Sequence, residues 1–156
     1  MKLKYIPAVL LLLLCAIPLP AQSTAEEMET LLATEAVTYE QAVRFLLEAS
    51  DAFATYDSQE AFRYAQEQKW LPKKVSADDK ARLNAVSFLA MRSFEMKGGV
   101  MYSITKKSTA LGSHYSYREL TAKKIIQGRT SPRMNVSGRL LLFITERMIT
   151  VNDTDY

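Results

Sequence analysis

Apolar residues along most of the chain recur with the 3.6-residue period of amphipathic helices. A first helix is predicted over 39–54, after a capping-box pattern that begins at Thr38. A second helix is predicted from Ser58 to about Trp70. It is ended by Pro72, because proline cannot donate the backbone hydrogen bond that a continuing helix needs.

The third helix is predicted to open at Ser76 and to end before Gly98. Asp78 and Asp79 would occupy its first turn, where carboxylates interact favourably with free N–H groups and with the positive end of the helix dipole. The segment 99–104 that follows alternates apolar and polar residues, which is typical of a short strand or an extended arm. We expect this arm to pack across the helices.

Two more helices are predicted in the C-terminal third. A capping box at Ser116 opens a short helix that ends at Gly128, and a longer helix starts at or just after Ser137. These elements predict an all-α bundle of about five helices, with one short extended arm or hairpin. The predicted core collects the apolar residues on the inner stripes: Leu46, Leu47, Phe62, Trp70, Leu83, Val86, Leu89, Phe94, Leu120, Ile126, Leu140, Leu141 and Ile144.

The chain resembles itself when one part is aligned with a later part. Residues 60–94 align without a gap with residues 115–149, and five of the aligned positions are identical. Two amphipathic helix pairs can look alike without a common origin. The order of short helix, loop and longer helix is kept in both units, however, which favours a duplication into two degenerate repeats with a period of about 55 residues.

A repeat of this length and order resembles the S-layer homology repeat over roughly residues 38–150. The second unit also resembles small exported envelope proteins of spirochaetes that carry degenerate repeats of this kind. The residues that carry this likeness are GGVMY at 98–102, YREL at 117–120, IIQGR at 125–129 and VSG at 136–138. The resemblance implies an envelope role, because S-layer homology domains bind cell-wall polysaccharide, usually as a trimer of repeats.

The sequence departs from that family at the positions that bind the polymer. The polymer-binding repeats carry a motif like Ile-Thr-Arg-Ala-Glu at the start of the longer helix. The corresponding stretches here are 81–84 and 136–139, where Leu83 and Gly138 occupy the position of the arginine and the acid is absent. Inheritance of the fold is therefore better supported than inheritance of the ligand.

The N-terminus has the three parts of a secretory signal peptide: a basic start, an uncharged apolar run over 8–17, and a small residue, Ala21, directly after a proline. The apolar run would extend only ~15 Å as a helix, too short for the ~30 Å core of a bilayer. We therefore predict no permanent membrane span. Cys15 does not fit a lipoprotein attachment site, because Leu14 stands where a small residue is required. The predicted organisation is a signal peptide at 1–21, an acidic leader at 22–36 that is frayed or forms a short helix, a helical domain at 37–150 and a disordered tail at 151–156.

Composition narrows the function further. The formal net charge of +3 falls to +1 once Lys2 and Lys4 leave with the signal peptide, so nothing in the charge favours a nucleic-acid partner. Cys15 is the only cysteine, so the processed chain can form no disulfide. We expect an exported protein of the periplasm or cell envelope.

The sequence lacks a convincing catalytic or cofactor pattern. His114 is the only histidine, and no phosphate-binding, dinucleotide-binding or nucleophile-elbow motif occurs, so neither a cofactor nor a metal is predicted. The main hypothesis is a non-catalytic binding or structural module. The alternative is a small periplasmic hydrolase that uses Asp78, Asp79 and His114.

A cluster of cations and tyrosines between the two units is the candidate partner-binding surface. Lysine and arginine side chains beside aromatic rings could bind an anionic glycan, so the predicted partner is peptidoglycan, another envelope glycan or an outer-membrane protein. The candidate residues are Tyr102, Lys106, Lys107, Tyr115, Tyr117 and Arg118. We expect Met101 and Ile104 to be shielded by the packed arm, and Lys106 and Lys107 to be exposed.

Overall fold

The computed structural model describes residues 20–154 except Tyr56, and within that part the fold is all-α. The predicted fold class is confirmed, although the described residues form seven helices rather than about five. Most of the predicted signal peptide, with Cys15, lies outside the described residues. The helices are α2 (Pro20–Ala33), α3 (Tyr39–Ala49), α4 (Ser58–Glu67), α5 (Leu83–Ser93), α6 (Val100–Thr105), α7 (Thr109–Ala122) and α8 (Gly138–Thr154).

The chain divides between Leu31 and Leu32 into two compact parts. Helix α2 covers most of the predicted acidic leader, so the leader is helical, and Met28 is 36% and Leu32 45% exposed. The second part holds the other helices. Among the described residues, no helix has the length and apolar character needed to cross a bilayer.

Side-chain caps fix the starts of α3 and α4. The Thr38 hydroxyl accepts a hydrogen bond from the Gln41 N–H at 3.2 Å, and the Gln41 side chain accepts one from the Thr38 N–H at 2.9 Å, which confirms the predicted capping box. Helix α4 is capped by Asp57, one position before the predicted Ser58, through the Gln59 N–H at 2.9 Å.

The start of α5 is corrected, because the helix begins at Leu83 and not at Ser76. Ser76 and Asp79 form a turn in the preceding loop, in which an Asp79 carboxylate oxygen accepts a hydrogen bond from the Ser76 N–H at 2.8 Å. Ser131 and Met134, their equivalents in the second unit, form the same turn, in which the Met134 sulfur accepts from the Ser131 N–H at 3.4 Å. Asp78 and Asp79 thus belong to a loop turn and not to a helix. The second unit carries Met134 at the position equivalent to Asp79.

Three further predictions are corrected in the C-terminal half. The segment predicted as an extended arm is the helix α6, and α7 begins at Thr109 rather than at Ser116. The tail predicted to be disordered from residue 151 is helical up to Thr154, because α8 continues that far.

Three backbone hydrogen bonds form a closed ring at the centre of the second part. The Val37 N–H donates to the Val136 carbonyl at 2.8 Å, the Ala81 N–H to the Val37 carbonyl at 2.9 Å, and the Val136 N–H to the Ala81 carbonyl at 2.9 Å. All three residues are fully buried. Each stands two positions before the first residue of a helix, α3, α5 or α8, so the ring joins three equivalent helix starts.

The ends of the helices show the same equivalence. Lys69 and Lys124, which the alignment of the two units superposes, follow α4 and α7 with the same φ of 59°. Asp51 and Glu95 follow α3 and α5 with the same φ of 51°. The sequence alignment predicted two units, and the backbone adds α3 as a third equivalent of α5 and α8.

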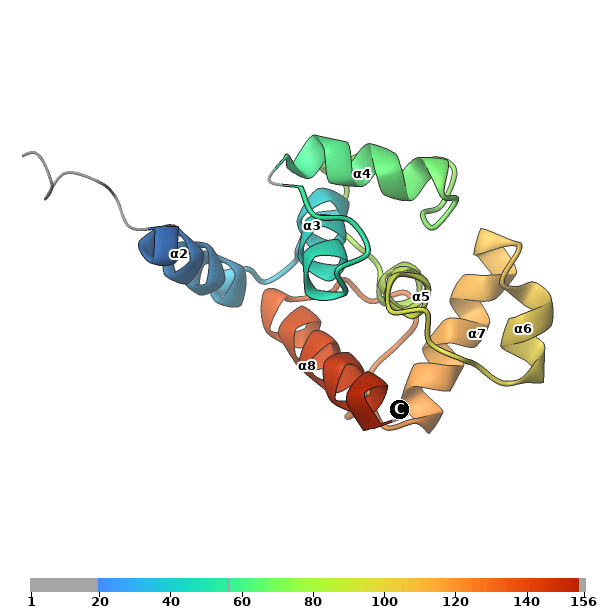
Figure 1. Cartoon of the computed structure of the whole chain (residues 1–156). Helices are drawn as coiled ribbons and strands as arrows, with labels where there is room; N and C mark the ends of the chain where they lie inside the picture. Colours follow the sequence, from blue (N-terminus) through green and yellow to red (C-terminus); the bar gives the residue numbers. More distant parts are fainter. Residues whose placement is uncertain (1–19, 56, 155–156) are drawn as a thin grey trace, which may run out of the picture. The chain divides into compact units, whose positions relative to one another are not determined.

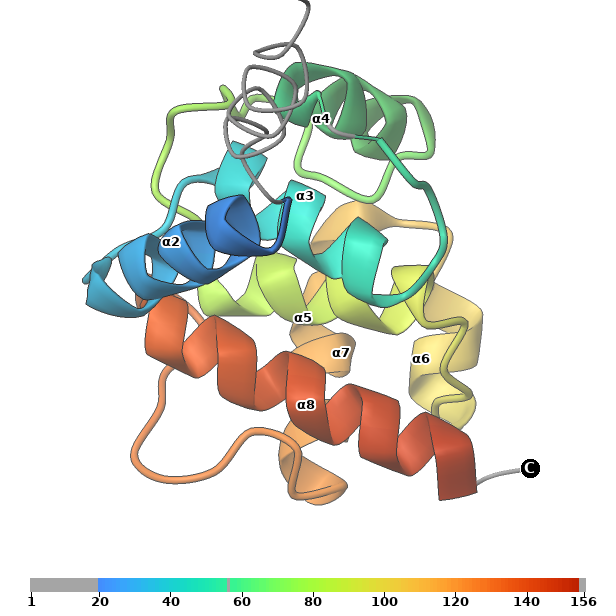
Figure 2. The same ribbon diagram turned by 60° about the vertical axis from the view of Figure 1, so that its left-hand side comes forward.

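Helix α5 is the most enclosed element of the second part. In Figure 1 it is seen nearly end-on between α3 and α7, and Figure 2 shows it passing between α3 and α8. Gly112 of α7 lies directly against the ring of Phe88, which lets these two helices approach closely. The predicted core residues are all buried except Leu140, which is half-buried on α8.

Candidate partner-binding surface

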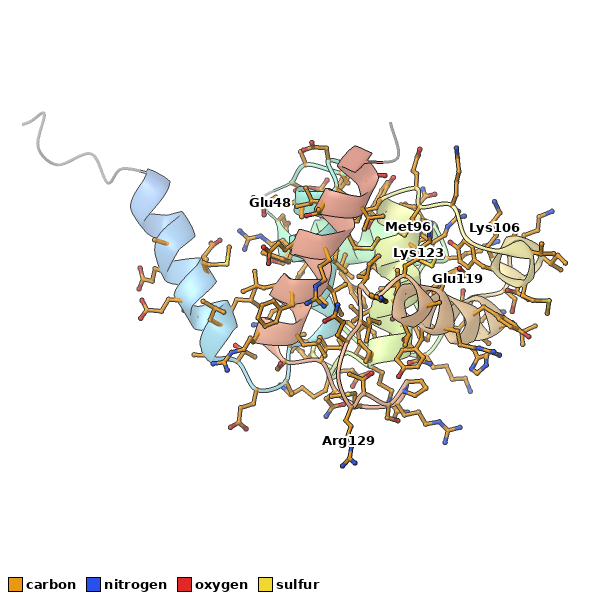
Figure 3. The ribbon with its side chains drawn as sticks, turned by 90° about the horizontal axis from the view of Figure 1, so that it is seen from below. Glu48, Met96, Lys106, Glu119, Lys123 and Arg129 are labelled. Carbon is orange, nitrogen blue, oxygen red and sulfur yellow. The ribbon has the colours of Figure 1, made fainter. Side chains whose placement is uncertain are left out.

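Helices α6 and α7 form a hairpin that is fastened at both of its ends. At the open end, the Gly99 N–H donates to a Glu119 carboxylate oxygen at 3.0 Å. Near the turn, the Thr109 hydroxyl donates to the Lys69 carbonyl at 2.8 Å, which ties the start of α7 to the end of α4. Figure 3 shows Glu119 on α7 facing the start of α6, with Lys106 beside α6. The first bond joins the two helices of the hairpin, and the second attaches the hairpin to the rest of the fold.

Tyr102 is the inward-facing anchor of α6. Its side chain is only 3% exposed and lies against Gly98, where a Cβ atom would collide with the ring. Burial raises the pKa of the Tyr102 hydroxyl, while the charge of Arg92 and its hydrogen bond to that hydroxyl lower the pKa by less. Tyr102 therefore fixes the helix and offers no ring to a partner, contrary to its predicted place on the binding surface.

The opposite side of α6 is apolar and exposed. Val100 is 76%, Met101 50% and Ile104 68% exposed, and these three residues are called the α6 apolar face from here on. Leu111, in the first turn of α7, is 56% exposed. The prediction that Met101 and Ile104 are shielded was wrong. In a helix, positions three apart share a side, so Met101 and Ile104 point outward together when Tyr102 points inward.

The predicted cations lie on the surface. Lys106 and Lys107 are exposed directly after α6, as expected, and Arg118 is exposed on α7. The two tyrosines of α7 are half-buried. The Tyr117 hydroxyl donates to the Thr130 carbonyl at 3.0 Å, which attaches α7 to the loop before α8. Of the six predicted site residues, Lys106, Lys107, Tyr115 and Arg118 remain available for a partner.

The residues of the alternative hydrolase site make structural contacts. Asp79 closes the loop turn with Ser76, and the His114 ring packs edge-on against Tyr115 with 5.3 Å between ring centres. Asp78 is exposed in the same loop as Asp79. Within the described residues, no group of three or more His, Cys, Asp or Glu side chains could hold a metal ion.

Trp70 and Arg92 form a cluster close to Tyr102 of α6, and the sequence did not predict it. The Arg92 guanidinium carbon lies 5.9 Å from the centre of the Trp70 ring, which is a cation–π contact. Two N–H groups of this pair, the indole Nε1 of Trp70 and the Nε of Arg92, are buried without a hydrogen-bond partner in the described part of the chain. The cluster is linked to α6, since Arg92 also interacts with the Tyr102 hydroxyl.

The α6 apolar face was missed although the sequence contains its signal. A helix over this segment places Val100, Met101 and Ile104 on one side, whereas a strand would place Val100, Tyr102 and Ile104 on one side, and both sets are apolar. The helix is only six residues long, and at that length the two patterns cannot be told apart.

No family model, curated protein or solved structure matches this chain. The fold and the surface define it as an all-α protein with an exposed apolar and basic hairpin.

Proposed function

We propose that this chain is an exported, non-catalytic module of the cell envelope that binds a cell-wall glycan or an envelope protein. The observation that carries the proposal is the ring of backbone hydrogen bonds at Val37, Ala81 and Val136, which joins the starts of the three helices α3, α5 and α8. The S-layer homology repeats that the sequence resembles usually work as a set of three. The three-unit arrangement supports that resemblance, and export is inferred from the signal-peptide pattern at 1–21.

The proposed contact surface for a glycan is the exposed side of α7 and the turn before it. It offers the Lys106 and Lys107 ammonium groups, the Arg118 guanidinium and one face of the half-buried Tyr115 ring. Cations beside an aromatic ring can bind the acidic groups and the sugar faces of an anionic glycan. The departures at 81–84 and 136–139 argue against the family's own polymer site, so a different surface is the better candidate.

Co-sedimentation with purified, lipid-free sacculi tests the proposal. We expect the wild-type protein to pellet with the sacculi, and the double variant Tyr115→Ala, Arg118→Gln to bind at least about tenfold more weakly, since a charge-assisted hydrogen bond contributes about 1.5–3 kcal/mol. The matched control is Lys73→Gln, which removes an exposed charge from the loop before α5 and should bind normally.

A pull-down from envelope extract separates the two classes of partner. Binding to sacculi identifies a glycan, whereas capture of one protein, lost in the same double variant, identifies a protein partner. Absence of both would refute the proposal. For the hydrolase alternative, unchanged substrate turnover in an Asp79→Ala, His114→Ala double variant would exclude those residues as catalysts.

A further inference from the structure

We propose that the α6 apolar face and the lysines beside it dock onto the surface of an anionic phospholipid membrane. The inference adds the α6 apolar face, which the glycan surface does not include, and shares Lys106 and Lys107 with that surface; it does not depend on the proposed function.

The hairpin is an addition to the repeat. The stretch between the bends at Glu95 and Lys124 is longer than the equivalent stretch between Asp51 and Lys69. The additional length accommodates α6 and the longer α7, which has 14 residues against the 10 of α4. Among the described residues, α6 has no counterpart between α3 and α4. Insertions within a repeat are often placed on the face that binds a partner.

The added helix exposes three of its apolar side chains. Tyr102 alone is turned inward, while Val100, Met101 and Ile104 are at least half exposed. Figures 1 and 3 both show α6 on the outer side of α7, away from α3 and α8. Exposure of adjacent aliphatic groups is unfavourable in water, so a contact that covers them is favoured.

The charges along the segment that forms this face are all positive. Residues 96–118 contain Lys97, Lys106, Lys107 and Arg118 and no aspartate or glutamate. Glu119, the acid of α7 that faces α6, is engaged by the Gly99 N–H. Aliphatic side chains that enter a bilayer interface, with lysines that reach the phosphate groups, are the pattern of interfacial membrane binding.

The size of the face favours a membrane over a protein partner. A helix as short as α6 is ~9 Å long, and its outer side is far smaller than the ~800 Å² that each partner buries in a stable protein interface. A membrane needs only a shallow apolar wedge, and each lysine near an anionic surface strengthens binding by roughly fivefold.

A local fluorescent probe in the full-length chain tests the inference. An environment-sensitive dye is attached to Ile104→Cys in a Cys15→Ser background and compared with the same dye on Ile149→Cys of α8, which is also an exposed isoleucine at 40%. The local signal is needed because the apolar run at 8–17 could bind vesicles by itself. Vesicles of phosphatidylcholine alone are compared with vesicles that also contain phosphatidylglycerol.

We expect the dye at position 104 to shift to the blue with the anionic vesicles only, and the dye at 149 to remain unchanged. The double variant Lys106→Gln, Lys107→Gln should raise the lipid concentration at half-maximal shift by roughly 30-fold. The control pair Lys73→Gln, Lys74→Gln should change it by less than about twofold. Equal shifts at positions 104 and 149, or equal response to neutral vesicles, would overturn the inference. A dye at 104 that ignores vesicles but responds to lipid-free envelope protein would overturn it in favour of a protein partner.

Discussion

The contact between α5 and α7 allows a test in which the sign of the effect is diagnostic. In an open helix, Gly→Ala stabilises a protein by about 1 kcal/mol, because alanine has less backbone freedom to lose on folding. Gly112 lies inside α7, but a Cβ atom there would lie 2.5 Å from Cε2 and 3.0 Å from Cδ2 of Phe88. The Phe88 side chain is 1% exposed, so it has little room to move aside. Overpacking of this kind costs about 1–3 kcal/mol. The overpacking cost less the helix gain leaves a net loss, so we expect Gly112→Ala to lower the free energy of unfolding by up to about 2 kcal/mol.

Urea denaturation followed by far-ultraviolet circular dichroism measures this change. A double-mutant cycle with Phe88→Leu identifies its cause, because a smaller side chain at 88 should relieve the clash. The loss in the double variant should then be smaller than the sum of the two single losses by at least about 0.5 kcal/mol. Stabilisation of the protein by Gly112→Ala alone would show that α5 and α7 do not approach this closely, and would refute the reasoning.

Burial and backbone geometry support three further predictions. Leu89→Ala should lower the free energy of unfolding by about 2–5 kcal/mol, since Leu89 is fully buried, and a loss below about 0.5 kcal/mol would place the residue on the surface. Lys124→Gly should raise that free energy by about 1 kcal/mol, because the φ of 59° at Lys124 is strained for any residue but glycine. Lys123→Gly should lower it, because Lys123 has an ordinary φ of −75° and glycine only adds freedom to the unfolded chain. Urea titrations of the two variants check these opposite signs. Burial raises the pKa of Tyr102 above 10.0, so the folded protein holds that proton more tightly than the unfolded chain. The contribution of Tyr102 to stability should be constant below about pH 9 and fall as the pH rises from about 10 toward the raised pKa, so Tyr102→Phe should reduce the decline measured in urea titrations.

The elements that were predicted well have side-chain signals near their ends. The start of α3 was readable because Thr38 and Gln41 form both halves of a capping box. The start of α5 was not, because its N-cap is Arg82, which makes no side-chain capping bond. The signal at Ser76 and Asp79 is chemically the same as a helix cap, but here it closes a loop turn. Sequence alone cannot separate these two uses of a short polar side chain.

The candidate site was predicted in part for a similar reason. The lysines at 106 and 107 were expected on the surface, since a charged pair is rarely buried. Which side of segment 99–104 faces the core depended on whether the segment is a strand or a helix, and the local pattern fits both. The structure decides the question through contacts from distant residues, Glu119 with Gly99 and Arg92 with Tyr102, which no local pattern contains.

The third unit was invisible in the sequence because the features that define it belong to the backbone. The spacing from Val37 to Ala81 is shorter than the spacing from Ala81 to Val136, so no single shift aligns all three units. The ring uses only backbone N–H and C=O groups. Its three residues, Val37, Ala81 and Val136, need only be apolar and small enough to be fully buried.

A framework with so few side-chain requirements can keep its arrangement while its surface changes. Under the proposed resemblance to S-layer homology repeats, this accounts for stretches at 81–84 and 136–139 that differ from the polymer-binding motif while three helix starts are still held together. It also means that the partner must be sought from the exposed groups of this chain, the hairpin of α6 and α7 first, and not from the positions that bind polymer in the repeats it resembles.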